Sequence, residues 1–319
     1  MALKTLTRRE RLSEAVARQT TAALLDGGVP ELEQGALLAL LDARADEIAE
    51  LAGCESALSE RCFRLRAHPS GVRPVVLAGH IGSADGPNLL PLLALALQRL
   101  TLQVVVHGVL GTPGRVVSAQ VFRELGLLPS VTLSQAQKEL DEAGFAFVPT
   151  AVLSPGLADL LALRGRIGFG GFAERLARFV DPFRGEGLTV VAAADERERR
   201  LLRGLLRERA GNHLLLDAGH GDPFADPRRR PVLELIRNGR GELLFEAEAG
   251  SVRCASNVPR TNDARGTAEW TRAIMRGELP MPLPLVNQIA CCLYGAGYTV
   301  DMNQAKAIAA VQTGSLLAA

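Results

Sequence analysis

The sequence is short of several residue types, and each shortage argues against a class of protein. Aromatic residues make up only 4% of the 319 residues, so stacking of bases on aromatic side chains is expected to contribute little to any binding. The five cysteines show no CxxC spacing, and the adjacent Cys291 and Cys292 have a poor geometry for a disulfide. Apolar runs such as residues 89–97 are too short to cross a bilayer. We therefore predict a cytoplasmic protein with reduced thiols and no membrane span.

A strong charge imbalance is also missing. The net charge of +1 neither requires nor excludes an anionic partner, so the clustering of charge matters more than its sum. The positive charge is almost entirely arginine, whose planar guanidinium favours bidentate contacts to phosphate. Hydrophobic residues make up 47% of the chain, which is enough to bury a sizeable core in about two domains or one large one.

The apolar pattern predicts an α/β fold with two domains. Residues 1–66 have helical periodicity and form a small all-helical domain, which helices from about 156–180 are expected to join. Residues 67–319 alternate short apolar strands with helices, which predicts a larger α/β domain with a mostly parallel central sheet. The predicted strands are residues 74–79, 102–108, 145–150, 188–193 and 213–217.

Two glycine-rich turns follow predicted strands and are candidates for a phosphate cleft. Such turns permit close approach of the backbone N–H groups to an anion. Asn88 is expected either to cap the following helix or to bond a phosphate oxygen. The first turn matches neither the dinucleotide-binding fingerprint nor the P-loop, and any α/β protein needs turns of this kind. The candidate cleft residues in the two turns are Gly79, Gly82, Asn88, His107, Gly108 and Arg115.

The stretch from Asn212 to Pro227 contains oxygen and imidazole side chains that suit a metal ion. His213, Asp217, His220 and Asp222 are the candidate ligands, but their spacing matches no known ligand set. A Gly/Pro-rich surface turn is the favoured interpretation, so the sequence predicts no metal site.

Arginines cluster in two segments near the middle of the chain. Residues 196–209 form an amphipathic helix whose leucines line one face and leave the arginines outside. A solvated helix face explains this cluster, but three consecutive arginines between prolines hold like charges together in a stiff turn. The nucleic-acid-binding candidates are Arg197, Arg200, Arg203, Arg207, Arg228, Arg229 and Arg230.

Taken in order, these segments resemble the anthranilate phosphoribosyltransferase family (glycosyltransferase family 3). The glycine-rich residues 78–88 match the diphosphate loop of that family, and VHGVL at 106–110 matches its K-H-G-N-R. Arg164, in LSPGLADLLALRGRIG, matches its substrate-contacting arginine. The resemblance implies a helical domain beside an α/β domain and a homodimer.

The departures from that family fall on polar and charged residues of its site. Its loop lysine and asparagine correspond to Val106 and Val109, and the histidine before its Pro-Ala corresponds to Ser154. Its magnesium-holding Asp-Glu pair corresponds to Pro223 and Phe224. Cations and Mg²⁺ ligands stabilise the diphosphate leaving group, so their loss predicts a fold without the reaction. The valines fit a loop that no longer holds that substrate.

A closer resemblance is to the non-tryptophan, YbiB-like branch, through PNLLPLLALAL, ADPRRRP and NQIACCLYGAG. That branch implies a dimer that binds DNA or RNA with little sequence preference. We therefore expect a non-specific nucleic-acid-binding homodimer that has lost transferase activity and needs no cofactor. The alternative is an active phosphoribosyltransferase that uses phosphoribosyl diphosphate, in which case Mg²⁺ is required. The sequence assigns no catalytic residue.

Overall fold

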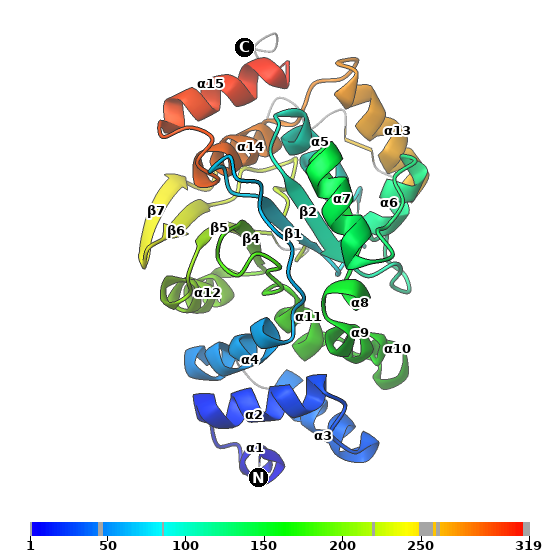
Figure 1. The fold of residues 1–319 in the computed structure, drawn as a ribbon, viewed down its shortest axis with the longest axis vertical. Coiled ribbons are helices and arrows are strands. Elements are labelled where there is room, and N and C mark those ends of the chain that lie inside the picture. Colours follow the sequence, from blue (N-terminus) through cyan, green and yellow to red (C-terminus); the bar gives the residue numbers. More distant parts are fainter. Residues whose placement is uncertain are drawn as a thin grey trace. The chain divides into compact units, whose positions relative to one another are not determined.

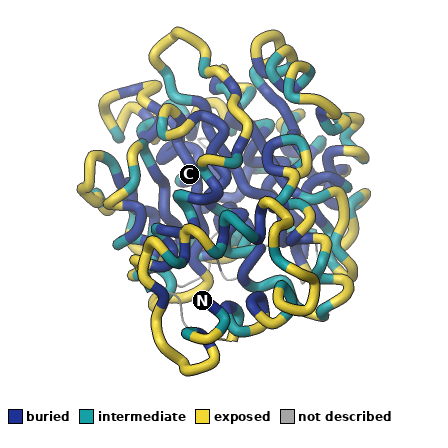
Figure 2. Tube along the Cα trace, turned by 60° about the horizontal axis from the view of Figure 1, so that its bottom comes forward, coloured by how far each residue is buried: buried dark blue, intermediate teal, exposed yellow. Residues whose placement is uncertain are grey.

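The computed structural model describes residues 2–43, 47–84, 86–218, 221–248, 258–259 and 262–314. The chain divides into two compact units, the first formed by Met1–Arg64 with Thr150–Pro182 and the second by Leu65–Pro149 with Phe183–Ala319. Buried positions concentrate in the interior and exposed positions in the loops (Figure 2).

The described residues of the first unit form helices and connecting loops, with no strand. Helices α2 and α4 form its largest packing contact, and Gly53 permits it because an added Cβ would clash with the carbonyl oxygen of Glu14. Ser13 caps α2 by accepting a hydrogen bond from the backbone N–H of Val16. The helices of this unit are α1 (Ala2–Thr7), α2 (Glu14–Leu25), α3 (Glu31–Asp42), α4 (Ile48–Glu60), α8 (Thr150–Leu153), α9 (Pro155–Ala162), α10 (Arg164–Ile167) and α11 (Gly171–Ala177).

The second unit contains a seven-stranded sheet in the order β3-β2-β1-β4-β5-β6-β7 (Figure 1). The first five strands in this order are parallel, and β6 and β7 are antiparallel to their neighbours, which confirms the predicted mostly parallel sheet. The strands are β1 (Val75–Gly79), β2 (Val104–Gly108), β3 (Phe145–Pro149), β4 (Leu188–Ala193), β5 (Asn212–Asp217), β6 (Leu233–Arg237) and β7 (Arg240–Phe245).

Helices cover both faces of this sheet. Val75, Leu77, Val104 and Val106 point from β1 and β2 into one large core, together with the leucines of α5 and α14. The buried leucines of α12 lie outside that core and pack on the opposite face, against β4 and β5 (Figure 1). The helices of this unit are α5 (Leu90–Arg99), α6 (Ser118–Glu124), α7 (Leu133–Ala143), α12 (Glu196–Glu208), α13 (Ala264–Met275), α14 (Leu283–Gly295) and α15 (Met302–Gln312).

The hairpin of β6 and β7 was not among the predicted strands. Asn238 and Gly239 join the two strands with φ angles of +50° and +73°, which suit a two-residue hairpin turn. The Asn-Gly dipeptide that favours such a turn is present in the sequence, between two apolar segments. Cys54, Cys62, Cys291 and Cys292 are buried and form no disulfide among the described residues, in agreement with the predicted reduced thiols, and Cys254 lies outside the described residues.

The strand order determines where a ligand site is expected. The chain runs from β1 outward to β2 and β3, and then returns to place β4 on the other side of β1. The winding direction therefore reverses between β1 and β4. In open α/β sheets, ligands bind beyond the carboxyl ends of the strands at such a switch point.

Candidate functional site

The carboxyl ends of β1 and β2 meet at two glycines. An added Cβ at Gly108 would clash with the carbonyl oxygen of Gly79. An added Cβ at Gly79 would lie 2.8 Å from a methyl carbon of Leu90 and 2.9 Å from Oγ of Ser118. Both glycines are therefore required by the packing of the strand ends, whether or not an anion binds beside them.

The two predicted glycine-rich turns lie side by side. Ser83 and Val116 pair in a short antiparallel bridge, with N–H···O distances of 3.0 Å in both directions. Gly82 has a φ angle of +75°, and an added Cβ there would lie 2.9 Å from the carbonyl oxygen of Val116. Arg115 donates from Nη1 to the carbonyl oxygen of Gly82 at 3.3 Å. The second turn thus holds the first in position.

Asn88 uses its side chain entirely within the fold. It is fully buried, donates from Nδ2 to the carbonyl oxygen of Val116 at 3.0 Å and accepts from the backbone N–H of Leu90 at 3.2 Å. The second bond satisfies a free N–H group at the start of α5. Asn88 thus bonds the first N–H group of α5, while Leu89 is the N-cap residue of that helix.

The carboxylate of Asp222 lies against the first glycine-rich turn. It accepts hydrogen bonds from the backbone N–H groups of Ile81 at 3.1 Å and Gly82 at 3.0 Å, and its residue is fully buried. Gly221 packs directly on the turn, since an added Cβ would lie 2.6 Å from Cδ1 of Ile81. The side chain of Asp222 thus accepts two hydrogen bonds from the backbone of the turn that resembles a diphosphate loop.

Gln288 of α14 holds the segment that carries Asp222. Its side chain donates to the carbonyl oxygen of Pro223 at 2.8 Å and accepts from the N–H of Ala225 at 2.7 Å. Asp222, Pro223, Phe224 and Ala225 are all buried. The prediction of a surface turn here is wrong for these residues, because the Gln288 amide satisfies backbone groups that water would otherwise have to reach. No pattern in the sequence pointed to Gln288.

His107 lies at the end of β2 with its side chain fully buried. Burial, with a smaller contribution from the charge of neighbouring His80, lowers the pKa of His107 from 6.5 to about 3. Neither ring nitrogen has a hydrogen-bond partner among the described residues. His107 is therefore a neutral ring at neutral pH. Its neighbour Val106 points into the apolar core.

His213 and Asp217, two of the residues considered as metal ligands, take part in other interactions. Nδ1 of His213 lies 2.5 Å from the hydroxyl of Thr189, and burial lowers the pKa of His213 to about 3. Asp217 pairs with Arg199 at 3.3 Å, and His220 lies outside the described residues. Over the parts of the chain that are described, no group of three or more possible ligands is close enough to hold a metal ion.

Arg164 belongs to the helical unit, in α10. Its guanidinium pairs there with the carboxylate of Glu174, and both side chains are partly exposed. The other cleft candidates, Gly79, Gly82, Asn88, His107, Gly108 and Arg115, all belong to the α/β unit.

The arginines of α12 fall into two sets. Arg199 pairs with Glu196 and Asp217, and Arg203 donates from Nε and Nη2 to Oε2 of the buried Glu234 at 2.7 and 2.6 Å. Arg197, Arg200 and Arg207 are exposed, and no ion pair involves them among the described residues. Part of the positive charge of this helix is thus used internally.

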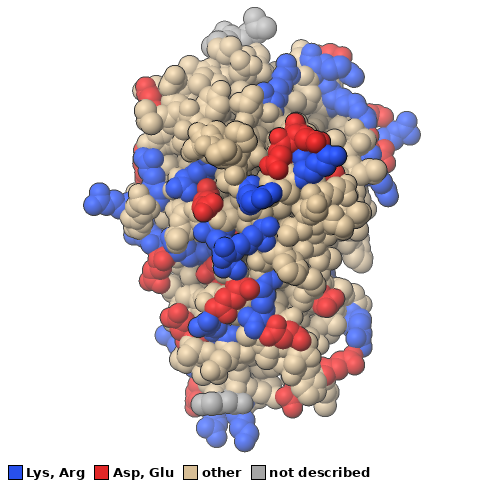
Figure 3. All heavy atoms as spheres, in the orientation of Figure 1, with Lys and Arg blue, Asp and Glu red and all other residues tan. Residues whose placement is uncertain are grey.

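The three consecutive arginines, Arg228 to Arg230, also differ in whether they pair with a carboxylate. Arg228 is exposed, whereas Arg229 pairs with Asp226 at 3.6 Å. Arg230 pairs with Glu248 at 3.0 Å and lies over the ring of Phe245. Basic and acidic side chains are interspersed over the surface drawn in Figure 3, in agreement with the near-zero net charge.

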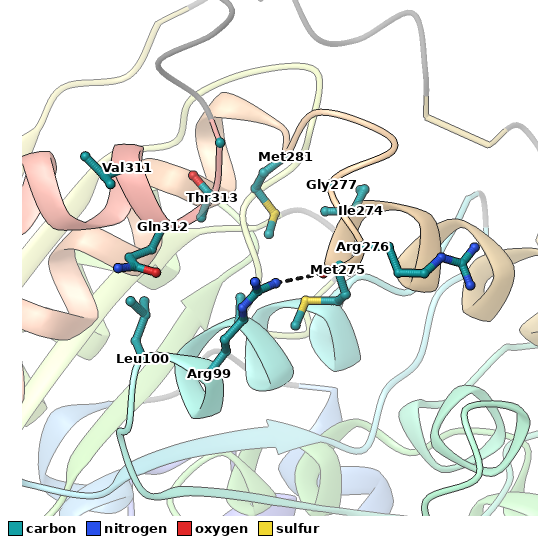
Figure 4. A pocket seen from close by; sticks show the side chains of 12 residues that line it. Arg99, Leu100, Ile274, Met275, Arg276, Gly277, Met281, Val311, Gln312 and Thr313 are labelled. Carbon is teal, nitrogen blue, oxygen red and sulfur yellow. Dashed lines mark hydrogen bonds between the residues drawn. The ribbon is translucent and has the colours of Figure 1, made fainter.

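Two surface recesses contain none of the predicted site residues. One, of about 300 Å³, lies where the ends of α5, α13 and α15 meet, and Arg99 donates there to the carbonyl oxygen of Met275 at 2.7 Å (Figure 4). The other, of about 390 Å³, lies between residues 68–72, the end of α5 and the end of α7.

No helix among the described residues is long and apolar enough to cross a membrane.

Comparison with known proteins identifies the family to which the chain belongs. The chain is 32% identical over 299 residues to the uncharacterised protein YbiB of Escherichia coli (strain K12), covering 93% of this chain and 92% of the other. It is 25% identical over 304 residues to the anthranilate phosphoribosyltransferase of Thermus thermophilus, covering 94% and 90%. The chain belongs to the anthranilate phosphoribosyltransferase-like family. No family model matches it.

Solved structures of anthranilate phosphoribosyltransferases share the fold. The enzyme of Thermus thermophilus superposes with a TM-score of 0.77 at 22% identity, over 98% of this chain and 94% of the other. The enzyme of Saccharomyces cerevisiae in complex with PRPP and Mg superposes with a TM-score of 0.73 at 12% identity, over 98% and 93%.

We expect His107→Leu to flatten the pH dependence of stability. Unfolded histidine takes up a proton below about pH 6.5, whereas buried His107 stays neutral down to about pH 3, so wild-type stability falls as the pH drops through this window. Each such histidine contributes a slope of about 1.4 kcal/mol per pH unit. Urea unfolding between pH 7 and pH 4 should show that His107→Leu lowers the slope by up to this amount.

The matched control is His68→Gln, at an exposed position, which should have the wild-type slope. At pH 7, His107→Leu should be at least as stable as wild type, because it removes buried nitrogens that lack partners among the described residues. A slope equal to that of wild type would show that His107 is protonated in the folded state.

Proposed function

We propose that the chain is a phosphoribosyltransferase-fold protein that binds DNA or RNA without sequence preference, in the cytoplasm and as a homodimer. The observation that carries this proposal is the outer face of α12, where Arg197, Arg200 and Arg207 are exposed and unpaired among the described residues. Holding unpaired like charges on one helix face costs free energy, which contacts to phosphate would recover.

The internal ion pairs divide the seven candidate arginines. Arg203, Arg229 and Arg230 already pair with carboxylates, so contact with phosphate would require them to share or exchange partners. Arg197, Arg200, Arg207 and Arg228 need no such exchange, and we assign the principal phosphate contacts to them. Because aromatic residues are scarce, we expect phosphate contacts to dominate over base stacking.

A homodimer would present two such arginine faces and offset the low net charge of one chain. The helical unit offers surface for self-association, since Leu32, Ile48 and Phe63 are 89%, 36% and 52% exposed. Other apolar residues of this unit, such as Leu37, Leu41 and Leu51, are buried within the single chain and do not add to this surface.

We further propose that the transferase reaction has been lost. Three observations support this. Asp222 places a carboxylate on the turn where a diphosphate would bind, Val106 is buried in the core, and Pro223 and Phe224 are buried where the family resemblance expects magnesium ligands. The second candidate remains an active phosphoribosyltransferase with Mg²⁺, supported by the relatives that bear that name.

Replacing Arg197, Arg200 and Arg207 together with glutamine should weaken binding to all oligonucleotide sequences alike. Each phosphate contact releases counterions, so the logarithm of affinity falls with the logarithm of salt by about 0.7 to 0.9 per contact. Loss of three contacts should therefore reduce this slope by about two to three. Fluorescence anisotropy of labelled single-stranded and duplex oligonucleotides over a tenfold salt range measures it.

The matched control for this variant removes the same charge elsewhere. Lys138, Arg265 and Arg276 lie on or just beyond α7 and α13, and their replacement by glutamine should change the slope little. Binding by the α12 variant that equals wild-type binding, or wild-type binding that is insensitive to salt, would refute the proposed interface.

We expect no transfer of phosphoribose to anthranilate above background. A steady-state assay with anthranilate, phosphoribosyl diphosphate and Mg²⁺ tests this, because the leaving diphosphate lacks the cations that would stabilise it. Turnover that depends on Mg²⁺ and is lost in Arg164→Ala would instead establish the transferase.

Light scattering at micromolar concentration should give twice the mass of one chain. Leu32→Glu places a charge on the exposed apolar surface of the helical unit and should shift the protein toward the single-chain mass. Leu128→Glu, at a position 70% exposed in the α/β unit, is the control and should leave the mass unchanged. A wild-type protein with the mass of one chain would contradict the dimer.

A further inference from the structure

We propose that the backbone N–H groups of Ile81 and Gly82 form a site for a small oxyanion, and that the chain fills this site with its own Asp222 carboxylate. The ligand class is a carboxylate or phosphate group, bound through N–H···O hydrogen bonds. Removing the Asp222 carboxylate would open the site to such an anion from solution. This inference deepens the proposed loss of transferase activity, which involves the same carboxylate, and it concerns residues other than the proposed nucleic-acid surface.

The first argument is the desolvation of the Asp222 carboxylate. The residue is fully buried, and burial of a charge is unfavourable unless hydrogen bonds to the charged form compensate it. Two backbone N–H groups supply such bonds, at 3.1 and 3.0 Å. Hydrogen bonds to an ionised acceptor are roughly twice as strong as neutral ones. The turn is therefore a place where this fold binds an anion.

The second argument is that the turn is held independently of Asp222. The Ser83–Val116 bridge and the Arg115 bond to the carbonyl oxygen of Gly82 involve no atom of Asp222. The φ angle of +75° at Gly82 is one that side-chain-bearing residues rarely adopt. The two N–H groups should therefore keep their common direction when the carboxylate is removed.

The third argument is that the carboxylate is delivered by a rigid segment. Gln288 bonds both Pro223 and Ala225, and Gly221 packs on Ile81. An anion attached to the fold in this way has a high effective concentration at its site. Free phosphate or diphosphate cannot match it, so the wild-type site should stay closed to both. The contact between Asp222 and the turn is thus an internal substitute for an oxyanion ligand.

The test is recovery of Asp222→Ala by added anions. The variant leaves two buried N–H groups without their acceptor, so its Tm should fall by roughly 5 °C or more. Sodium formate, which replaces the deleted group, or inorganic phosphate should then raise the Tm in a saturable manner. Sodium chloride at the same ionic strength gives the reference. The wild-type Tm should respond to formate and phosphate no more than to chloride.

Two results would overturn the inference. One is an Asp222→Ala protein whose Tm responds to formate and phosphate as it does to chloride. The other is an Asp222→Ala protein as stable as wild type without added anion, which would show that the carboxylate is not needed there.

If Asp222→Ala does not fold, Asp222→Asn gives a second test through hydrogen exchange. The asparagine keeps the size of the side chain but removes its charge, so the amides of Ile81 and Gly82 should exchange roughly tenfold faster than in wild type, as the loss of one charge-assisted bond implies. Unchanged exchange at both amides would contradict the site. Oligonucleotide binding by either variant should equal that of wild type, so failure of this inference and failure of the proposed function give different results.

Discussion

Buried backbone groups must find hydrogen-bond partners, and this requirement governs the carboxyl edge of the sheet. The turn after β1 satisfies two of its N–H groups with the Asp222 carboxylate, and the segment that carries Asp222 satisfies its own backbone with Gln288 of α14. Three distant parts of the chain therefore depend on one another. The consequence is a switch point that is filled from within, where related folds leave space for a ligand.

Buried charges also require partners, and this requirement divides the arginines of α12 into those that pair with carboxylates and those that are exposed. Arg203 pairs with the buried carboxylate of Glu234, and breaking a buried pair by removing one partner is strongly destabilising. Arg199 links α12 to Asp217 at the end of β5. These pairs attach the helix to the sheet and orient its remaining arginines outward. The arginines that remain on the outer face of α12 make no ion pair among the described residues. They can therefore contact phosphate, even though the whole chain carries almost no net charge.

The sequence predicted those parts of the fold that depend on local patterns. Continuous apolar runs identified β1 to β5, and leucine spacing identified α12, because burial on both faces of a sheet or on one helix face leaves a periodic record. The hairpin of β6 and β7 was missed although Asn238-Gly239 signalled it. The bond from Asp222 to Gly82 spans 140 positions, and no local pattern encodes such a contact. Pairing of Arg203 with Glu234 depends likewise on the position of β6 beside α12.

The central claim is that this family member binds nucleic acid on the outer face of α12 while the carboxyl edge of its sheet is closed to diphosphate. A competition experiment tests whether nucleic acid and the diphosphate substrate share a site. The wild-type protein, saturated with a labelled oligonucleotide, is titrated with phosphoribosyl diphosphate and Mg²⁺ at constant ionic strength while anisotropy is recorded. The account predicts that the oligonucleotide stays bound throughout the titration. Saturable displacement of the oligonucleotide under these conditions would show that both ligands share an open cleft, and would contradict it.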